Sequence, residues 1–355
     1  MSENGHSNGG GNGASAGAAN GGAATLTKAD FQSGQETRWC PGCGDYAILA
    51  SVQALMPELG VPPEKTVFIS GIGCAGRFVY YMDTYGVHGI HGRAPALATG
   101  IATSREDLSV WVVSGDGDSL SIGGNHLIHA LRRNVPIKLL LFNNQIYGLT
   151  KGQYSPTSET GKITKSTPFG SEDHPFNPLA LALGADASFV ARTIDIEKKH
   201  LAATLRAAAE HPGSAFVEIY QNCNVFNDGA FDAVRGKAGA DNQIRLEHGE
   251  PIRFGADGER GVVRSSSGGL EVVDVADVGE DALVVHDAHV ADPSHATALA
   301  RLADSPTGPT PIGVFRDVVR GVYGAERQED LDTAHGKATL ADVDELLHAG
   351  DTWVV

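Results

Sequence analysis

Short apolar runs that end in glycine- or asparagine-rich turns are the feature that most limits the folds open to this chain. They are rich in Val, Ile, Leu and Phe and alternate with longer segments of helical period, the pattern of a mostly parallel β-sheet. The predicted strands are Thr66–Ser70, Ser109–Ser114, Ile137–Phe142 and Ala215–Tyr220. The predicted helices are Asp45–Met56, Ala94–Thr103, Gly124–Arg133 and Ile196–Ala209, with Asp45 and Asp195 as N-caps. We therefore predict an α/β fold with helices flanking the sheet.

Residues suited to ligand binding follow each predicted strand. The four turns, in chain order, are Gly71-Ile-Gly73, Gly115-Asp-Gly-Asp118, Asn143-Asn144 and Asn222-Cys-Asn224. The carboxyl ends of parallel strands meet at one edge of a sheet, where open α/β sheets bind their ligands. The sequence therefore predicts a ligand site at this edge.

The charge balance narrows the classes of partner. The chain has 355 residues, and its 27 basic and 43 acidic residues give a formal net charge of −16. This balance argues against a nucleic acid partner and leaves no polybasic patch for a membrane surface. The apolar runs have only the length of strands, so no membrane span is expected. The N-terminus lacks the basic and apolar regions of a secretory signal, so we expect a cytoplasmic protein.

Composition divides the chain into three regions. Residues 1–24 are a Gly/Ala/Asn-rich tract, which predicts a disordered tail. Residues 25–230 contain the strands and turns described above and are predicted to form one binding domain. Periodicity then fades, and residues 228–269 are rich in Gly, Arg, Asp and Ser. We expect residues 231–355 to be a C-terminal extension that packs on the core or on a partner.

The chain contains only four cysteines, and each lies beside glycine, proline or asparagine. They are Cys40, Cys43, Cys74 and Cys223. Four such thiols can form two disulfides, one tetrahedral zinc site or one cubane iron–sulfur cluster. Cytosolic thiols stay reduced, which disfavours the disulfides. Composition leaves the zinc and iron–sulfur interpretations open.

The order of Gly115-Asp116-Gly117, a helical segment, a strand and Asn143-Asn144 matches the needs of a diphosphate–magnesium site. Glycines let the backbone approach phosphate oxygens, and a helix N-terminus supplies N–H donors. Asp116 and Asn144 offer the hard oxygen ligands that Mg²⁺ prefers, and the backbone carbonyl of Ile146 lies just beyond. A single Gly-Asp-Gly is more often an ordinary turn. The spacing to the asparagine pair favours the metal site.

Together these motifs resemble the β subunits of 2-oxoacid:ferredoxin oxidoreductases, which use thiamine diphosphate and an iron–sulfur cluster. The resemblance spans about Trp39 to Asp228. Its motifs are Trp39-Cys-Pro-Gly-Cys-Gly-Asp45, Gly71-Ile-Gly-Cys-Ala-Gly-Arg77, His91-Gly-Arg-Ala94, Gly115-Asp-Gly-Asp-Ser119, Asn143-Asn-Gln-Ile-Tyr-Gly-Leu-Thr150 and Cys223. It implies that residues 25–230 form a thiamine diphosphate-binding domain of the pyrophosphate-binding type.

The resemblance also implies which residues hold the cofactors. Ligands of one [4Fe–4S] cluster are expected at Cys40, Cys43, Cys74 and Cys223. Ligands of Mg²⁺ are expected at Asp116, Asn144 and the Ile146 carbonyl. Contacts with thiamine diphosphate are expected at Ile72, Gly73, Cys74, Ala75, His91, Asp116, Gly117, Asp118, Asn144, Gly148 and Leu149.

The implied activity is oxidative decarboxylation of a 2-oxoacid with coenzyme A, giving an acyl-CoA and CO₂. Thiamine diphosphate supplies the decarboxylation chemistry, and a nearby cluster accepts electrons singly and passes them to ferredoxin. The glutamate that activates the aminopyrimidine ring in this cofactor class has no candidate here, so we expect it on an α subunit. The chain alone is therefore predicted to be inactive, and an αβ pair or its dimer is the expected assembly.

The substrate is expected to be 2-oxoglutarate, with pyruvate as the alternative within the family. The segment Tyr147–Gln153 most resembles the 2-oxoglutarate enzymes. Arg77, Arg93 and Lys151 are candidates for contacting a substrate carboxylate or a coenzyme A phosphate. Each of the three is equally well explained as a surface charge.

Three other classes of protein remain as alternatives. A non-redox thiamine diphosphate decarboxylase or synthase would keep the Asp116 and Asn144 site without four clustered thiols. A zinc-stabilised binding module would use the cysteines structurally. A dinucleotide-binding enzyme fits the Gly-x-Gly-x-x-Gly pattern of Gly71–Gly76, but no acidic residue follows at the ribose-binding distance, near Arg93–Leu97.

Overall fold

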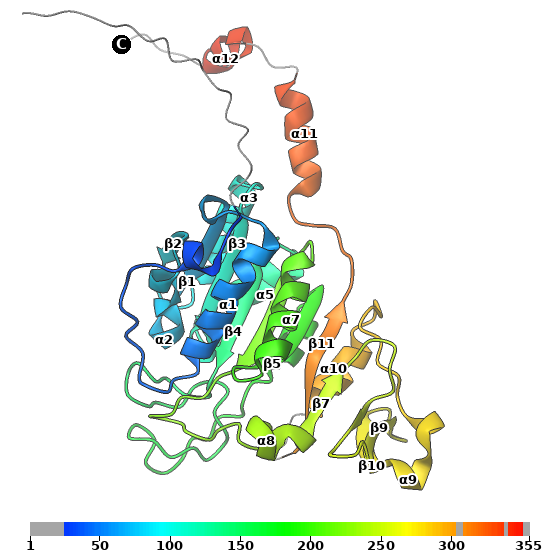
Figure 1. Ribbon diagram of the computed structural model, residues 1–355. Coiled ribbons are helices and arrows are strands. Elements are labelled where there is room, and N and C mark those ends of the chain that lie inside the picture. Colours follow the sequence, from blue (N-terminus) through cyan, green and yellow to red (C-terminus); the bar gives the residue numbers. More distant parts are fainter. Residues whose placement is uncertain (1–24, 303–307, 337–339, 351–355) are drawn as a thin grey trace, which may run out of the picture.

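A computed structural model describes residues 25–302, 308–336 and 340–350, and its centre is one eight-stranded sheet (Figure 1). The strand order is β2-β1-β3-β4-β6-β5-β11-β7. The strands are β1 (Thr66–Ser70), β2 (Tyr85–His88), β3 (Ser109–Gly115), β4 (Lys138–Asn143), β5 (Phe189–Ile194), β6 (Ala215–Tyr220), β7 (Gln243–Leu246) and β11 (Thr310–Asp317). The first six are parallel to one another, whereas β11 pairs antiparallel with β5. The predicted fold class is confirmed.

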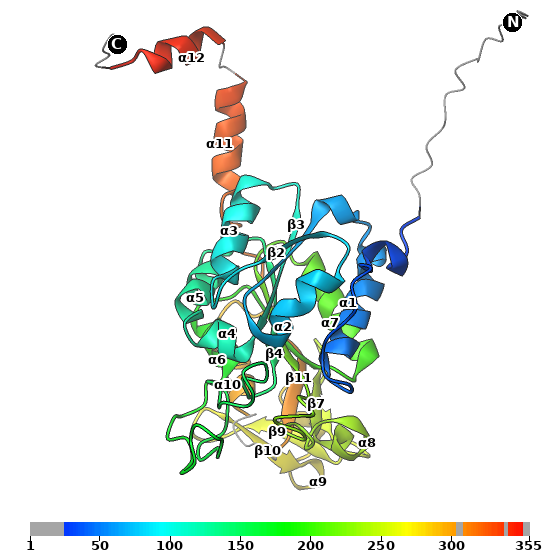
Figure 2. The same cartoon turned by 90° about the vertical axis from the view of Figure 1, so that its left-hand side faces the viewer.

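Helices cover both faces of this sheet, as the edge-on view of Figure 2 shows. One face packs against α1 (Asp45–Leu59) and α7 (Lys198–Glu210). The other packs against α3 (Ala94–Ser104), α5 (Gly124–Arg132), α6 (Pro178–Gly184) and α10 (Ser294–Arg301). Successive residues of β4 alternate between the two cores, Leu139 and Leu141 facing one and Leu140 the other. Burial on both faces is why these strands read as continuous apolar runs.

Two predicted helix caps are wrong. The N-cap of α1 is Gly44, and Asp45 is already the first helical residue. Helix α7 begins at Lys198 after Glu197, so Asp195 does not cap it. Both aspartates are buried instead, and their side chains take part in the site described below.

The segment after residue 230 extends the central sheet and adds a small sheet of its own. β7 and β11 form the last two positions of the large sheet. The antiparallel small sheet contains β8 (Arg253–Phe254), β9 (Arg260–Arg264) and β10 (Leu270–Asp274). This segment also contains four further helices: α8 (Gly236–Gly239), α9 (Val275–Val278), α11 (Ala325–His335) and α12 (Leu340–Leu347). Helices α11 and α12 stand away from the body of the molecule in Figure 1. A proposed boundary near residue 230 therefore separates segments that share one sheet.

Short helical turns complete the described part of the chain. They include α2 (Gly73–Gly76) and α4 (Asp116–Leu120), which follow β1 and β3 directly. The 3₁₀ turns are η1 (Lys28–Phe31), η2 (Pro63–Lys65), η3 (Arg77–Tyr81), η4 (Ala240–Asn242) and η5 (Glu280–Ala282). No helix within the described ranges is long and apolar enough to cross a bilayer. The predicted N-terminal tail lies outside the described residues.

Candidate active site

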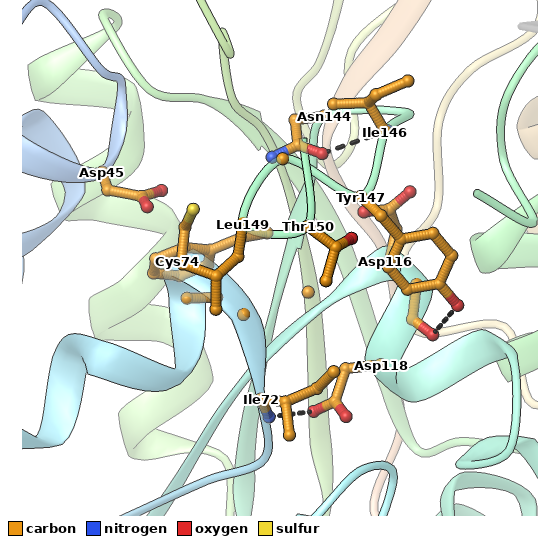
Figure 3. A pocket seen from close by; sticks show the side chains of 16 residues that line it. Asp45, Ile72, Cys74, Asp116, Asp118, Asn144, Ile146, Tyr147, Leu149 and Thr150 are labelled. Atoms are coloured by element: carbon orange, nitrogen blue, oxygen red, sulfur yellow. Dashed lines mark hydrogen bonds between the residues drawn. The ribbon is translucent and has the colours of Figure 1, made fainter. Parts of the chain in front are cut away.

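The turns after β1, β3 and β4 surround a pocket at the carboxyl edge of the sheet (Figure 3). The lining residues are Asp45, Ile72, Gly73, Cys74, Ala75, Gly115, Asp116, Gly117, Asp118, Phe142, Asn144, Ile146, Tyr147, Gly148, Leu149 and Thr150. Every residue expected to contact the cofactor lines this pocket except His91. Five lining residues were not among the expected cofactor or metal contacts: Asp45, Gly115, Phe142, Tyr147 and Thr150.

Asp118 joins three segments around the pocket. Its Oδ1 accepts hydrogen bonds from His91 Nδ1 at 2.8 Å and from the Gly92 backbone N–H at 2.7 Å. Its Oδ2 accepts from Ser114 Oγ at 2.7 Å and from the Ile72 N–H at 3.2 Å. A Cβ on Gly71 would lie 1.8 Å from Oδ2, so only glycine fits there. This network connects His91 to the pocket wall.

Asp116 is held by hydroxyl groups from a distant loop. The carboxyl is 2% exposed, and its Oδ2 accepts from Ser155 Oγ at 2.5 Å and Thr157 Oγ1 at 2.6 Å. Burial raises the pKa of Asp116, and the two hydroxyl bonds oppose that rise. Sequence reasoning missed Ser155 and Thr157 because nothing local marks these loop hydroxyls as close to Asp116.

The turn after β4 places Asn144 and Ile146 beside Asp116. Asn144 Oδ1 accepts from the Ile146 N–H at 3.2 Å, while Asn144 Nδ2 donates to Gln221 at 2.8 Å. Gln145 has φ of 56°, a left-handed conformation that non-glycine residues adopt rarely and often at functional sites. A carboxylate, an amide oxygen and a carbonyl are hard donors of the kind Mg²⁺ takes, so this set fits the metal.

Tyr147 closes the pocket over Gly117. Its hydroxyl donates to the Gly117 carbonyl at 2.7 Å, and a Cβ on Gly117 would lie 2.3 Å from the tyrosine ring. The ring also meets His91 edge-on, with centroids 6.4 Å apart. Without a Cβ, the Gly117 backbone can approach a phosphate closely, which fits a diphosphate group in this pocket.

The cysteines come together from three segments of the chain. Trp39 Nε1 donates to the Cys74 carbonyl at 2.8 Å, and Asn224 Nδ2 donates to the Pro41 carbonyl at 2.7 Å. A Cβ on Gly148 would lie 3.4 Å from Cys223 Sγ and 3.8 Å from Cys74 Sγ. All four cysteines are free thiols in this structure.

Burial affects the pKa of two of these thiols, those of Cys43 and Cys74. It raises the pKa of Cys43 and raises that of Cys74 to about 12, and the charge of Asp45 adds to both shifts. Gln221 Nε2 donates to Cys43 Sγ at 3.2 Å. The buried thiols are therefore protonated at neutral pH, and a metal that binds them must displace the protons.

Within the described ranges, no three His, Cys, Asp or Glu side chains are already arranged around one metal ion. A zinc ion needs four ligands at about 2.0–2.3 Å from a single atom. A cubane cluster instead has one thiolate on each of four iron atoms, which separates the ligands more widely. Four soft thiols on three adjoining turns fit that larger group.

Asp45 and Asp195 form a buried acidic pair behind the cysteines. Burial raises the pKa of Asp45 to about 7, and the charge of Asp195 adds to the effect. Asp195 is fully buried and pairs with Arg235 at 2.8 Å, and it also accepts from the Asn222 N–H at 3.0 Å. The bond between Asp195 and the Asn222 backbone anchors the segment that carries Cys223.

The three candidate substrate residues lie outside the pocket lining. Arg77 borders a neighbouring hollow that shares Ile72, Gly73 and Leu149 with the pocket, and its Nε donates to Tyr81. Arg93 precedes α3 and donates to the His91 carbonyl at 3.3 Å. Lys151 is exposed on the rim and has φ of 78°. Their expected roles stay predictions.

Comparison with known proteins gives matches over most of the chain. The thiamine pyrophosphate enzyme, C-terminal TPP binding domain family matches residues 71–219. The 2-oxoglutarate oxidoreductase subunit KorB of Mycobacterium tuberculosis is 59% identical over 328 residues, which cover 92% of this chain and 88% of that protein. The 2-oxoacid:ferredoxin oxidoreductase 1 subunit beta of Aeropyrum pernix is 45% identical over 54% of this chain and 60% of its own length.

A solved structure resembles the whole architecture. It is a 2-oxoglutarate:ferredoxin oxidoreductase from Magnetococcus marinus with 2-oxoglutarate, coenzyme A and succinyl-CoA bound. The TM-score is 0.73 and the sequence identity 32%, with 93% of this chain and 97% of that chain covered.

Proposed function

Because the chain belongs to the β subunits of 2-oxoacid:ferredoxin oxidoreductases, we propose that it binds thiamine diphosphate, Mg²⁺ and one [4Fe–4S] cluster. With an α subunit, it would oxidatively decarboxylate 2-oxoglutarate and transfer the succinyl group to coenzyme A, giving succinyl-CoA and CO₂. A cluster held by the four cysteines would supply the route for electrons to ferredoxin. The relatives named above act on 2-oxoglutarate or 2-oxoacids, which supports this substrate class.

The position of Cys74 is the observation that carries this proposal. Cys74 lines the pocket together with Asp116 and Asn144, and it also belongs to the group of four cysteines. A single turn after β1 therefore serves both the expected cofactor pocket and the expected cluster. Thiamine diphosphate would supply decarboxylation chemistry when bound, and a cluster held by the four cysteines would supply one-electron acceptor chemistry beside it.

The residues of this chain position and shield the reacting groups. Asp116, Asn144 and the Ile146 carbonyl would hold Mg²⁺, and Gly117 and Gly148 leave room for the diphosphate. A carboxylate only accepts hydrogen bonds, so His91 donates to Asp118 from Nδ1, and a neutral ring then keeps its lone pair on Nε2. Tyr147 and Leu149 form part of the apolar wall of the pocket.

Several parts of the proposal concern partners. An α subunit would supply the activating glutamate, and Arg77, Arg93 and Lys151 would meet the 2-oxoacid or coenzyme A from outside the lining. Ferredoxin is the proposed acceptor, and free thiols agree with a reducing, cytoplasmic location.

The test is to purify the chain anaerobically with its partner subunit and measure iron, acid-labile sulfide and thiamine diphosphate. We expect one cluster and one thiamine diphosphate per chain. Adding 2-oxoglutarate and coenzyme A should reduce a low-potential dye, and omitting coenzyme A should remove most of the reduction. The chain purified alone should give no reduction.

Other outcomes identify the rival classes. Thiamine diphosphate without iron would indicate a non-redox thiamine enzyme. Zinc in a colourless protein would indicate a structural site formed by the cysteines. Faster dye reduction with pyruvate than with 2-oxoglutarate would keep the family but change the substrate.

A further inference from the structure

Three buried hydroxyl side chains on the loop between β4 and α6 bracket the expected Mg²⁺ ligands. Ser155 and Thr157 both donate to Asp116 Oδ2, at 2.5 and 2.6 Å. Ser158 donates to the carbonyl of Gln145, the residue after Asn144, at 2.6 Å. The three hydroxyl residues are each at most 3% exposed, although they lie on a mostly polar loop. We refer to Ser155, Thr157 and Ser158 as the hydroxyl clamp.

The clamp is connected to a chain of buried polar groups that crosses the sheet. Asn143 Oδ1 lies 3.0 Å from Thr157 Oγ1, and Asn143 Nδ2 donates to Glu218 at 2.7 Å. Glu218 in turn accepts from Arg192 Nε at 2.6 Å. Asn143, Glu218 and Arg192 are each at most 2% exposed. Buried polar groups of this kind are stable only when all of them are hydrogen-bonded, so this network fixes the orientation of each of its side chains.

The hydroxyl proton of Thr157 is donated to Asp116 rather than to Asn143. A threonine has one hydroxyl proton, whereas both Asn143 Oδ1 and Asp116 Oδ2 are acceptors. Asn143 Oδ1 already accepts from the Gln145 N–H at 3.2 Å, and the contact of Thr157 with Asp116 is the shorter one. Thr157 and Ser155 therefore both donate to Oδ2. Among the described residues, no side-chain hydroxyl or amide donates to Oδ1, and the other hydrogen bonds to the carboxyl come from the backbone N–H groups of Gly117 and of Asp116 itself.

We propose that Ser155 and Thr157 are positioning residues that fix the Asp116 carboxylate so that Oδ1 is presented to the divalent cation. Ser158 fixes the adjoining turn that carries Asn144. The clamp thus sets the relative position of two metal ligands that come from different strands. Outer-shell groups of this kind orient the ligands they bond and raise metal affinity. This inference rests on the proposed Mg²⁺–thiamine diphosphate site.

The experiment uses the full chain in complex with its partner subunit, freed of divalent metal by a chelator. Mg²⁺ binding at saturating thiamine diphosphate is measured by titration calorimetry. The variants are Thr157→Val, which keeps the shape but removes the hydroxyl, Thr157→Ser, which restores it, and Ser155→Ala. The control is Thr160→Val on the same loop, where the exposed hydroxyl donates to the Asp173 carbonyl at 2.9 Å.

We expect Thr157→Val and Ser155→Ala to weaken Mg²⁺ binding by about 10–100-fold. Thr157→Ser should recover most of the affinity, and Thr160→Val should leave it unchanged. The KM for Mg²⁺ should rise while kcat at saturating metal falls much less. Iron content and the electron paramagnetic resonance spectrum of the reduced cluster should not change, because the clamp does not contact the cysteines.

Two results would overturn the inference while leaving the proposed function intact. One is unchanged Mg²⁺ affinity in both Thr157→Val and Ser155→Ala. The other is a general loss of iron and thermal stability that accounts for the weaker binding, which would make the clamp a purely structural element. A wild-type complex that bound no thiamine diphosphate would instead overturn the proposed function, and this inference with it.

Discussion

The two parts of the central sheet differ in where their strands point. β1, β3, β4 and β6 run parallel and all end at the edge that carries the pocket and the cysteines. β11 pairs antiparallel with β5, and β7 runs parallel to β11, so these two strands end at the opposite edge. The first part of the sheet, made of β1, β3, β4 and β6, is therefore the chemical part. The second part, made of β7 and β11, is the supporting part. Strand direction, rather than distance along the sheet, decides which strands can supply site residues.

The two parts also bury polar groups for different purposes. In the first part, buried Asp116 and Asp118 are bonded by groups from distant loops and face the pocket. In the second part, buried His286 donates to the Val314 carbonyl of β11 at 2.8 Å and does not line the candidate pocket. Changes in the first part should therefore remove activity, whereas changes in the second should alter stability.

The largest expected effect is loss of the cluster in Cys223→Ala. Removing one of four thiolate ligands should prevent a stable cubane from forming, so iron and dye reduction should both fall to background. The far-ultraviolet circular dichroism of the complex should stay close to that of the wild type, because Cys223 lies in a turn after β6. Iron analysis and the dye assay check this.

The matched control for that change is Val225→Ala, two positions away on the same turn and 54% exposed. It should keep its iron and most of its activity. Full activity in Cys223→Ala would show that Cys223 is not a cluster ligand, and would erase the chemical distinction between the two parts of the sheet.

The next effect arises where the two parts meet. Arg192 of β5 pairs with buried Glu218 of β6 and donates to the Pro311 carbonyl of β11 at 3.3 Å. Arg192→Met should leave Glu218 buried without its charged partner, which costs about 3–5 kcal/mol of unfolding free energy. Urea unfolding followed by circular dichroism measures the change.

Arg206→Met provides the comparison, because Arg206 pairs with Glu58 at the exposed surface. We expect it to cost less than about 1 kcal/mol. If both variants lost similar amounts of stability, the buried pair would not be what joins the two parts of the sheet.

The first part of the sheet was largely predictable from the sequence, because its signals are local. Apolar runs gave the bounds of β1 and β6, and the motifs at Gly71, Asp116 and Asn144 located the pocket edge. Glycines in these motifs are required by contacts that leave no room for a Cβ, as at Gly71 and Gly117. Local sequence was therefore enough to predict these strands and the edge of the pocket.

The rest was not predictable because it depends on contacts between distant residues. Ser155 and Thr157 lie 39 and 41 positions from Asp116, and nothing in their own segment marks that contact. Asp195 looked like a helix cap from its place before α7, but its partners Arg235 and Asn222 become neighbours only in the fold. β7 has only four residues, and it gains its place in the sheet by pairing with β11 across a long insertion.

A third prediction concerns the pH dependence of the supporting part. His286 is 1% exposed, and burial lowers its pKa from 6.5 to about 4. Between these values the unfolded chain binds a proton that the folded chain does not, so stability falls as the pH drops from 6.5 towards 4. The full loss is about 3 kcal/mol.

Urea unfolding at several pH values should show this slope in the wild type and a shallower one in His286→Gln, which keeps a donor for the Val314 carbonyl. His174→Gln, at an exposed position in the loop before α6, should retain the wild-type slope. Equal slopes in all three proteins would mean that other groups set the acid sensitivity.

The smallest expected effect lies farthest from the chemistry, in the small sheet. Arg253 of β8 pairs with Glu280, whose side chain is 69% exposed, and Arg253 also donates to the Gly258 carbonyl at 2.9 Å. Glu280→Gln removes only the charge of the exposed partner, so it should cost less than about 1 kcal/mol and leave dye reduction unchanged. Unfolding and the dye assay should be run beside Cys223→Ala. A clear loss of activity in Glu280→Gln would mean that the small sheet communicates with the pocket, because no residue of β8, β9 or β10 lines that pocket.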